Sequence, residues 1–309
     1  MKRVFVDGSA GTTGLKICER LSGRSDLELV VLPEETRKDV SARRKALNSA
    51  DVAFLCLPDA AAVEAVTLVE NEDTVIIDTS TAHRTAAGWE YGFPELEYRR
   101  ERIASARRIA NPGCHASGFI ALVEPLVRIG LVAPDAALSA FSLTGYSGGG
   151  KKMIAEYGEN LPSDMYLGGR QYALGQAHKH LPEITKICGL SVAPVFCPII
   201  VPHFSGMETT VTLFSKDLKG SPDDIRSVYA ARYCGNGIVR YVADPSEFGV
   251  LSSASLAGRD DMEVSVYGNS ERILLVARFD NLGKGASGAA IQNMNLVLGC
   301  DEKSGLICS

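Results

Sequence analysis

One segment of the chain places a cysteine where its neighbours favour covalent chemistry. Asn111-Pro112-Gly113 is a turn sequence, Cys114 follows it directly, and an apolar run that predicts a helix starts at Ala116. We therefore expect Cys114 at or beside the amino-terminal end of a helix, where the dipole and the free N–H groups favour the thiolate. The thiolate is the nucleophilic form, so Cys114 is a candidate for a covalent intermediate. The alternative is a buried cysteine in a turn, and the flanking glycine and histidine argue against simple packing.

A nucleophilic cysteine needs a neighbouring group that accepts and donates protons. The chain has five histidines, and two of them are candidates for this role. His115 is adjacent in sequence, but its side chain need not face the thiol. His203 follows Val201-Pro202, precedes a strand-like stretch and could reach across from the second domain, although spacing alone favours a surface or core histidine.

The motif His178-x-His180-x-x-Glu183 has the composition of a metal site. Two histidines two residues apart share a face only on an extended segment, and Leu181-Pro182 predicts a turn instead. No third His or Cys ligand follows nearby. We therefore expect no metal here, and interpret the segment as a loop held by hydrogen bonds.

A glycine-rich segment, Gly145-Tyr-Ser-Gly-Gly-Gly-Lys151, precedes a stretch that predicts a helix, Met153–Glu156. The backbone N–H groups of a flexible loop of this kind can cradle a phosphate or orient an acyl group. One lysine and two hydroxyl groups within it favour a binding site over a simple linker.

A second glycine pattern, Gly8-x-x-Gly11-x-x-Gly14, lies between the first strand-like and the first helix-like segment. Glycines at this crossover allow a tight turn and a close approach of the backbone to a phosphate, and the helix start can receive a pyrophosphate. Thr12 and Thr13 can add hydroxyl donors. The spacing differs from the common G-x-G-x-x-G, so nucleotide binding is favoured by the position of the motif more than by its letters.

The charged residues after the second strand leave the choice of cofactor open. Glu34 and Glu35 stand where an acid would bind the ribose of NAD. Arg37 and Lys38 follow at once and can pair with the 2′-phosphate of NADP. The alternative for all four is a solvated loop.

Two kinds of element must position these groups. In the first half, strand-like segments alternate with helix-like ones: Val4–Val6, Leu15–Leu21, Leu27–Leu32, Val40–Leu47, Val52–Leu57, Ala60–Val69 and Val75–Asp78. Continuous apolar strands are typical of a parallel sheet covered on both faces. The alternation predicts an α/β fold with a Rossmann-type, doubly wound parallel sheet.

The pattern changes after Cys114. A helix is predicted over Ala116–Ile129, followed by strands over Ala136–Thr144, Val192–Val201, Glu208–Phe214 and Ile273–Phe279, and by a final helix over Gly288–Leu298. This order predicts an α+β domain built on a largely antiparallel sheet.

The composition excludes several classes of protein. Of 309 residues, 46% are hydrophobic and 22% charged, which predicts a folded chain, and the net charge of −5 without a basic run argues against nucleic-acid binding. Asp7 and Gly8 interrupt the first apolar stretch, so no signal peptide is expected, and Ala193–Pro202 is too short to span a bilayer. Eight cysteines without a C-x-x-C pair predict reduced thiols. We expect a soluble, cytoplasmic protein.

Several segments together resemble the shorter form of the N-acetyl-γ-glutamyl-phosphate reductases of arginine biosynthesis. The resemblance runs nearly end to end and lies in Asp7-Gly-Ser-Ala-Gly-Thr-Thr-Gly14, Phe54-Leu-Cys-Leu-Pro-Asp59, Asp78-Thr-Ser-Thr-Ala-His-Arg84, Tyr91-Gly-Phe-Pro-Glu-Leu96, Asn111-Pro-Gly-Cys-His115, Gly145–Lys151, His178-Lys-His-Leu-Pro-Glu-Ile184 and Asn281-Leu-Gly-Lys-Gly-Ala-Ser-Gly-Ala-Ala-Ile-Gln-Asn-Met-Asn295.

The resemblance implies Cys114 as nucleophile, NADP as cofactor and reduction of an acyl phosphate through a thioester. His203 matches a Pro-His pair that is followed by Met, here Met207, and is implied as the general acid/base. The longer form continues with Arg-Gly where this chain has Thr209-Thr210, so substrate contacts there do not carry over. Further residues are expected to bind the cofactor, namely Gly8, Gly11, Thr12, Thr13, Gly14, Arg37, Lys38, Ser80 and Gln292. Others are expected to bind substrate, namely Ser147, Gly148, Gly149, Lys151, His180 and Glu183.

The same resemblance implies the domain organisation. Residues 1–113 with 286–309 are expected to form an NADP-binding Rossmann domain completed by the carboxy-terminal helix. Residues 114–285 are expected to form the catalytic and oligomerisation domain of a homotetramer.

Three rival functions remain at this point. Aspartate-semialdehyde dehydrogenases look similar in fold and mechanism, but the Tyr-Ser-Gly-Gly-Gly-Lys and Gln-Asn-Met-Asn segments favour the acetylglutamyl enzymes. A Cys-His amidohydrolase would need no nucleotide loop, so tight NADPH binding would exclude it. A non-catalytic nucleotide-sensing protein would lack an unusually reactive Cys114.

Overall fold

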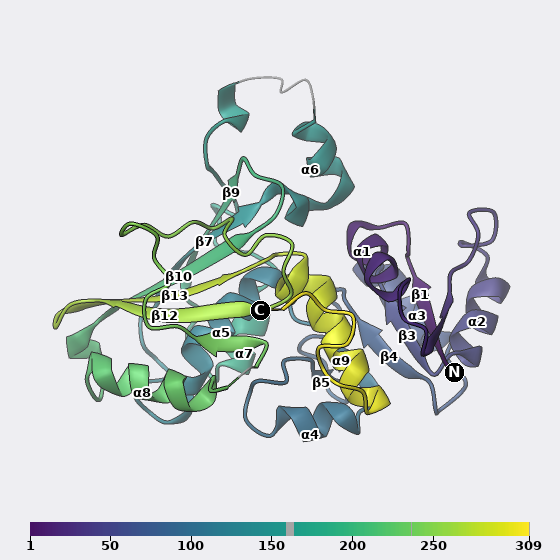
Figure 1. The fold of residues 1–309 in the computed structure, drawn as a ribbon, viewed down its shortest axis with the longest axis horizontal. Helices are drawn as coiled ribbons and strands as arrows, with labels where there is room; N and C mark the ends of the chain where they lie inside the picture. Colours follow the sequence, from purple (N-terminus) through teal and green to yellow (C-terminus); the bar gives the residue numbers. More distant parts are fainter. Residues whose placement is uncertain (159–163, 236, 309) are drawn as a thin grey trace. The chain divides into compact units, whose positions relative to one another are not determined.

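The computed structural model describes residues 1–158, 164–235 and 237–308. The chain divides into two compact units (Figure 1). Unit 1 comprises Met1–Gly113 and Ala286–Ile307, and unit 2 comprises Cys114–Gly285 and Cys308.

Unit 1 is built on a six-stranded sheet in the order β2-β1-β3-β4-β6-β5, with every pair parallel. Its strands are β1 Lys2–Asp7, β2 Leu27–Val30, β3 Val52–Leu55, β4 Val75–Asp78, β5 Glu90–Tyr91 and β6 Arg108–Ala110. Its helices are α1 Thr12–Leu21, α2 Val40–Ser49, α3 Asp59–Thr67, α4 Arg99–Ala104 and α9 Gly288–Leu298. The predicted doubly wound sheet is confirmed, while β5, α4 and β6 were not anticipated.

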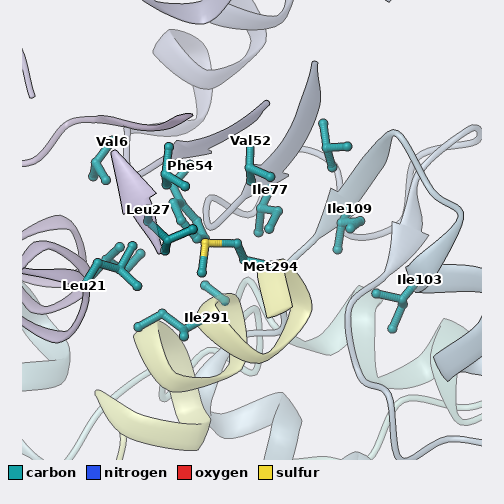
Figure 2. Packing of buried hydrophobic residues seen from close by; sticks show 14 residues of the cluster. Val6, Leu21, Leu27, Val52, Phe54, Ile77, Ile103, Ile109, Ile291 and Met294 are labelled. Atoms are coloured by element: carbon teal, nitrogen blue, oxygen red, sulfur yellow. The ribbon is translucent and has the colours of Figure 1, made fainter. Parts of the chain in front are cut away.

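The sheet of unit 1 is buried on both faces, which explains its continuous apolar strands. On one face, Val6 and Phe54 pack against a cluster that includes Ile291 and Met294 of α9. Figure 2 shows these two α9 side chains pointing toward the strands. On the other face, Phe5 packs in a second cluster formed with residues of α2 and α3.

Unit 2 is built on a seven-stranded mixed sheet in the order β11-β12-β13-β10-β7-β9-β8. Its strands are β7 Ser139–Gly145, β8 Arg170–Gln171, β9 Val195–Val201, β10 Met207–Phe214, β11 Val239–Tyr241, β12 Met262–Gly268 and β13 Arg272–Phe279. Only the β7–β9 and β11–β12 pairings are parallel in the described ranges, so the predicted largely antiparallel sheet is confirmed.

Helices α5 Cys114–Arg128, α7 Leu181–Ile187 and α8 Pro222–Arg232 lie on one side of this sheet (Figure 1). Helix α5 is buried along most of its length. A Cβ on Gly118 would lie 2.5 Å from the Thr209 hydroxyl oxygen of β10, so glycine lets the helix pack directly on the strand. This packing fixes the start of α5, where Cys114 lies.

The other face of the same sheet carries exposed apolar side chains. Strand register places Phe141, Val195, Phe214 and Leu274 on one face, and each of these side chains is exposed. Exposed apolar patches of this kind are typical of interaction surfaces.

Candidate active site

Cys114 is the first residue of α5, two residues earlier than the predicted helix start, and is half-buried. The backbone of Gly285 passes beside it. A Cβ on Gly285 would lie 3.0 Å from the Cys114 Cβ and 3.0 Å from the Asp280 carbonyl oxygen. A side chain at position 285 would therefore press on Cys114, and glycine lets the backbone pass this close to the cysteine.

His115 faces the core of unit 2 and uses both ring nitrogens there. Nδ1 lies 2.7 Å from the Ser142 Oγ and Nε2 lies 2.7 Å from the Tyr172 hydroxyl oxygen. Burial, together with the charges of His178 and Lys179, lowers the pKa of His115 to about 3. The ring is therefore neutral near pH 7 and poorly suited to shuttle protons.

Tyr172 is a residue near the cysteine that the sequence did not single out. Burial raises the pKa of its phenol above the usual value, and the negative charge of Cys114 adds to this rise. No motif around Tyr172 marks it in the sequence, since it stands in a segment rich in glycine, alanine and polar residues.

His203 lies in the short loop between β9 and β10. Its Nε2 is 2.9 Å from the Ser253 Oγ, and its Nδ1 has no hydrogen-bond partner among the described residues. Burial lowers the pKa of His203 below its ordinary value, while backbone hydrogen bonding at Ser205 and the charge of Asp280 oppose this. Nε2 thus faces a hydroxyl group and Nδ1 is buried, and the acid/base role of His203 stays a prediction.

The glycine-rich segment is helical, so the expected flexible loop is corrected. Tyr146–Gly149 form a 3₁₀ helix and Gly150 begins α6, Gly150–Glu156. The N–H groups of Tyr146 and Ser147 donate to carbonyl groups of the His203 loop, 3.0 Å to His203 and 2.9 Å to Phe204. These bonds order residues that a run of glycines would otherwise leave loose.

The predicted substrate-side residues fall into two groups. Ser147 is buried, and its Oγ accepts a hydrogen bond of 2.9 Å from Asn281, whereas Gly148, Gly149 and Lys151 are exposed. Their roles stay predictions.

His180 and Glu183 lie at the start of α7 and are buried. The Leu181-Pro182 pair begins this helix and does not form a separate turn, because proline fits the first helical positions. The His180 ring lies 5.8 Å from that of His115, centroid to centroid. Across the described ranges no cluster of metal-ligating side chains is found.

The glycine loop of unit 1 borders a pocket of about 430 Å³ at the carboxyl end of β1. Its lining includes Gly8, Gly11, Arg37 and Lys38, and it also includes two residues that were not predicted, Asp7 and Arg43. Asp7 and Arg43 form a buried ion pair of 3.0 Å. Glycine is required at position 8, where φ is +82° and a Cβ would lie 2.2 Å from the Cys56 carbonyl oxygen.

The remaining predicted cofactor residues are outside the lining of this pocket. Thr12, Thr13 and Gly14 form the first turn of α1. The buried Ser80 donates a hydrogen bond of 2.7 Å to Asp78. The buried Gln292 of α9 donates to Glu95 and Glu302. Their assignment to the cofactor stays a prediction.

The class of the protein follows from two family models. The semialdehyde dehydrogenase NAD-binding domain matches residues 3–106, and the semialdehyde dehydrogenase dimerisation domain matches residues 114–281. Solved structures agree in fold. Aspartate semialdehyde dehydrogenase II of Vibrio cholerae aligns with a TM-score of 0.74 at 16% identity, covering 97% of this chain and 98% of that one. The Candida albicans enzyme, solved with NADP, aligns with a TM-score of 0.67 at 17% identity, covering 97% and 99%.

Curated relatives narrow the class. N-acetyl-γ-glutamyl-phosphate reductases of Brucella ovis and Brucella canis are 45% identical over 306 residues, which cover 96% of this chain and 99% of each relative. The chain therefore belongs to the semialdehyde dehydrogenase family and, within it, to the N-acetyl-γ-glutamyl-phosphate reductases. The resemblance inferred from the motifs is confirmed. Within the described ranges, no helix is both long and apolar enough to cross a membrane.

Proposed function

We propose that this enzyme reduces N-acetyl-L-glutamyl 5-phosphate to N-acetyl-L-glutamate 5-semialdehyde and phosphate, with NADPH, in arginine biosynthesis. The observation that carries the proposal is the 45% identity to the N-acetyl-γ-glutamyl-phosphate reductases along nearly the whole chain. The position of Cys114 at the first residue of α5 supports it, because a helix start stabilises a thiolate.

The proposed reaction proceeds through a covalent intermediate on Cys114. The thiolate attacks the acyl carbonyl, phosphate leaves, and a thioester forms. NADPH, when bound, supplies the hydride that reduces the thioester carbonyl. His203 donates a proton to the oxygen of the resulting thiohemiacetal and takes it back as the C–S bond breaks, which releases the aldehyde and the thiolate.

The residues of the glycine-loop pocket fit a dinucleotide phosphate. Gly8 allows the backbone to approach closely, and α1 begins directly after Gly11. Arg37 and Lys38 line the pocket, whereas Glu34 does not and instead pairs with Arg37 at 2.8 Å. This arrangement favours NADP over NAD, because only NADP carries the 2′-phosphate that a cation binds.

On this proposal, residues 1–113 with 286–309 bind NADP, and residues 114–285 hold the reaction and the oligomer contacts. The exposed apolar face of the seven-stranded sheet supports self-association, and a homotetramer is the assembly that the family resemblance implies. The substrate is bound beside Cys114 by the predicted groups Ser147, Gly148, Gly149, Lys151, His180 and Glu183. The reduced cysteines are in keeping with work in the cytoplasm.

The test runs the reaction in reverse. Purified protein is supplied with N-acetyl-L-glutamate 5-semialdehyde, phosphate and NADP, and NADPH formation is followed by absorbance. We expect turnover that requires phosphate and is much slower with aspartate semialdehyde. Faster turnover of aspartate semialdehyde would indicate an aspartate-semialdehyde dehydrogenase instead. NADPH binding without any turnover would favour a nucleotide-sensing protein.

A further inference from the structure

Asp280 is a buried carboxylate that connects the elements around Cys114. It follows β13 directly and is 2% exposed. Its Oδ2 accepts hydrogen bonds from the Ser205 hydroxyl at 2.7 Å and from the Gly258 N–H. Its Oδ1 accepts from the N–H groups of Leu282 at 2.6 Å and Gly283 at 3.2 Å. All four partners are donors, which suits a carboxylate and not an amide.

The same residue holds the backbone that borders the nucleophile. The Asp280 carbonyl oxygen accepts a hydrogen bond of 3.0 Å from the Gly285 N–H. Gly285 is the residue whose Cβ would press on Cys114. The turn from Asp280 to Gly285 is therefore closed by Asp280 at both its side chain and its backbone, and it forms one wall at the cysteine.

Asp280 is also bound to the loop that carries His203. Ser205, its hydroxyl partner, is two residues beyond His203, and the neighbouring Asn281 accepts a hydrogen bond of 3.0 Å from the Gly206 N–H. The negative charge of Asp280 acts on His203 and favours its protonated form, while the Ser253 hydroxyl and the Ser205 backbone beside the ring carry no charge.

We propose that Asp280 is a positioning residue for both reacting groups. It holds the Gly285 backbone against Cys114, holds the His203 loop through Ser205, and supplies the counter-charge for the His203 imidazolium. The inference rests on the proposed function, since that function assigns Cys114 and His203 to the reaction.

The test separates charge from position by three variants assayed in the reverse direction. There His203 takes the proton from the thiohemiacetal oxygen as the hydride leaves, so kcat falls at low pH, where the imidazole is protonated. This fall is the acid limb of the kcat profile. Asp280→Asn removes the charge, so the pKa of His203 falls and the acid limb of the kcat profile moves to lower pH. Asp280→Glu keeps the charge but displaces it, so kcat falls while the limb stays. Ser205→Ala keeps the charge and loses one bond to the loop, so kcat falls about tenfold with the limb unchanged.

Asp261→Asn is the matched control, because Asp261 is an equally buried carboxylate of unit 2 that pairs with Arg240 and Arg259. We expect it to lower the melting temperature without moving the limb. A second readout, the rate at which iodoacetamide alkylates Cys114 as a function of pH, needs no substrate.

Two results would overturn the inference. One is a folded Asp280→Asn variant whose acid limb and alkylation profile match those of the wild type. The other is a Ser205→Ala variant with full kcat and unchanged alkylation, which decides the matter even if Asp280→Asn does not fold. Failure of the proposed function looks different, since the wild type itself would then show no phosphate-dependent turnover.

Discussion

The double variant Arg37→Ala/Lys38→Ala tests the cofactor assignment most directly. Both side chains line the pocket beside the glycine loop. If they bind the 2′-phosphate, their removal should weaken NADP binding and leave NAD binding within about twofold, because NAD lacks that phosphate.

The size of the effect follows from the exposure of the two side chains. A hydrogen bond to a charged group is worth about 1.5–3 kcal/mol, and partial exposure places each contact at the lower end, about 1.5 kcal/mol. The Glu34 partner of Arg37 is 83% exposed, so this competing pair subtracts only about 0.5 kcal/mol. The sum of about 2.5 kcal/mol corresponds to a loss of about 60-fold in NADP affinity.

The assay is the KM for NADP and for NAD in the phosphate-dependent reverse reaction, with direct binding of NADPH as a check. Arg44→Ala is the matched control, because Arg44 lies in α2 next to the pocket residue Arg43, pairs with Glu70 and does not line the pocket. Glu34→Ala should strengthen NADP binding about twofold, since it removes the competitor. Equal losses for NADP and NAD in the double variant would refute the reasoning and return both residues to a solvated loop.

Four further predictions concern the reacting groups and the glycine loop. Cys114→Ser should abolish turnover and leave NADPH affinity within about twofold, and near-normal turnover would remove the thioester mechanism. His203→Asn should lower kcat by about 10²–10⁴ and remove the acid limb of its pH profile, whereas His115→Asn should keep that limb; the reverse outcome would transfer the acid/base role to His115. The folded chain holds the pKa of His115 at about 3, whereas the unfolded chain protonates this residue near its ordinary pKa of 6.5. His115 therefore makes the fold less stable as pH falls from 6.5 toward 3, and chemical unfolding of His115→Asn should show a flatter pH dependence in that range. Gly8→Ala should lower the free energy of unfolding by about 3 kcal/mol, since φ is +82° and the added Cβ meets a carbonyl oxygen. In Gly11→Ala the nearest atom to the added Cβ is 3.4 Å away, so this variant should lose less stability. Equal losses of stability in the two variants would contradict the geometry.

The sequence predicted elements wherever burial imposed a simple pattern. Strands buried on both faces, such as Val52–Leu55, read as continuous apolar runs and were found. Strand β5 has only two residues and helix α4 is largely charged, so neither shows the periodicity of hydrophobic residues by which an element is recognised. The helicity of Tyr146–Gly149 was missed because it depends on hydrogen bonds to a loop more than 50 residues away.

The candidate site was predictable only as far as its chemistry is local. Cys114 is set by a turn and a helix start within a few residues, and the glycine pattern at Gly8 is equally local. The orientation of His115 is not local, because its partners, Ser142 and Tyr172, lie 27 and 57 residues away in the chain. Asp280 contacts Ser205, which lies 75 residues earlier in the chain, and no motif around Asp280 predicts this contact.

Helix α9 has a consequence for how the chain is made. Ile291 and Met294 are fully buried in the same cluster as Val6 and Phe54 (Figure 2). A ribosome synthesises the strands of unit 1 first and must complete residues 114–285 of unit 2 before α9 emerges. During that interval one face of the first sheet is without its covering helix and presents apolar side chains to water. The nascent unit is therefore a natural client for a chaperone until the last helix arrives.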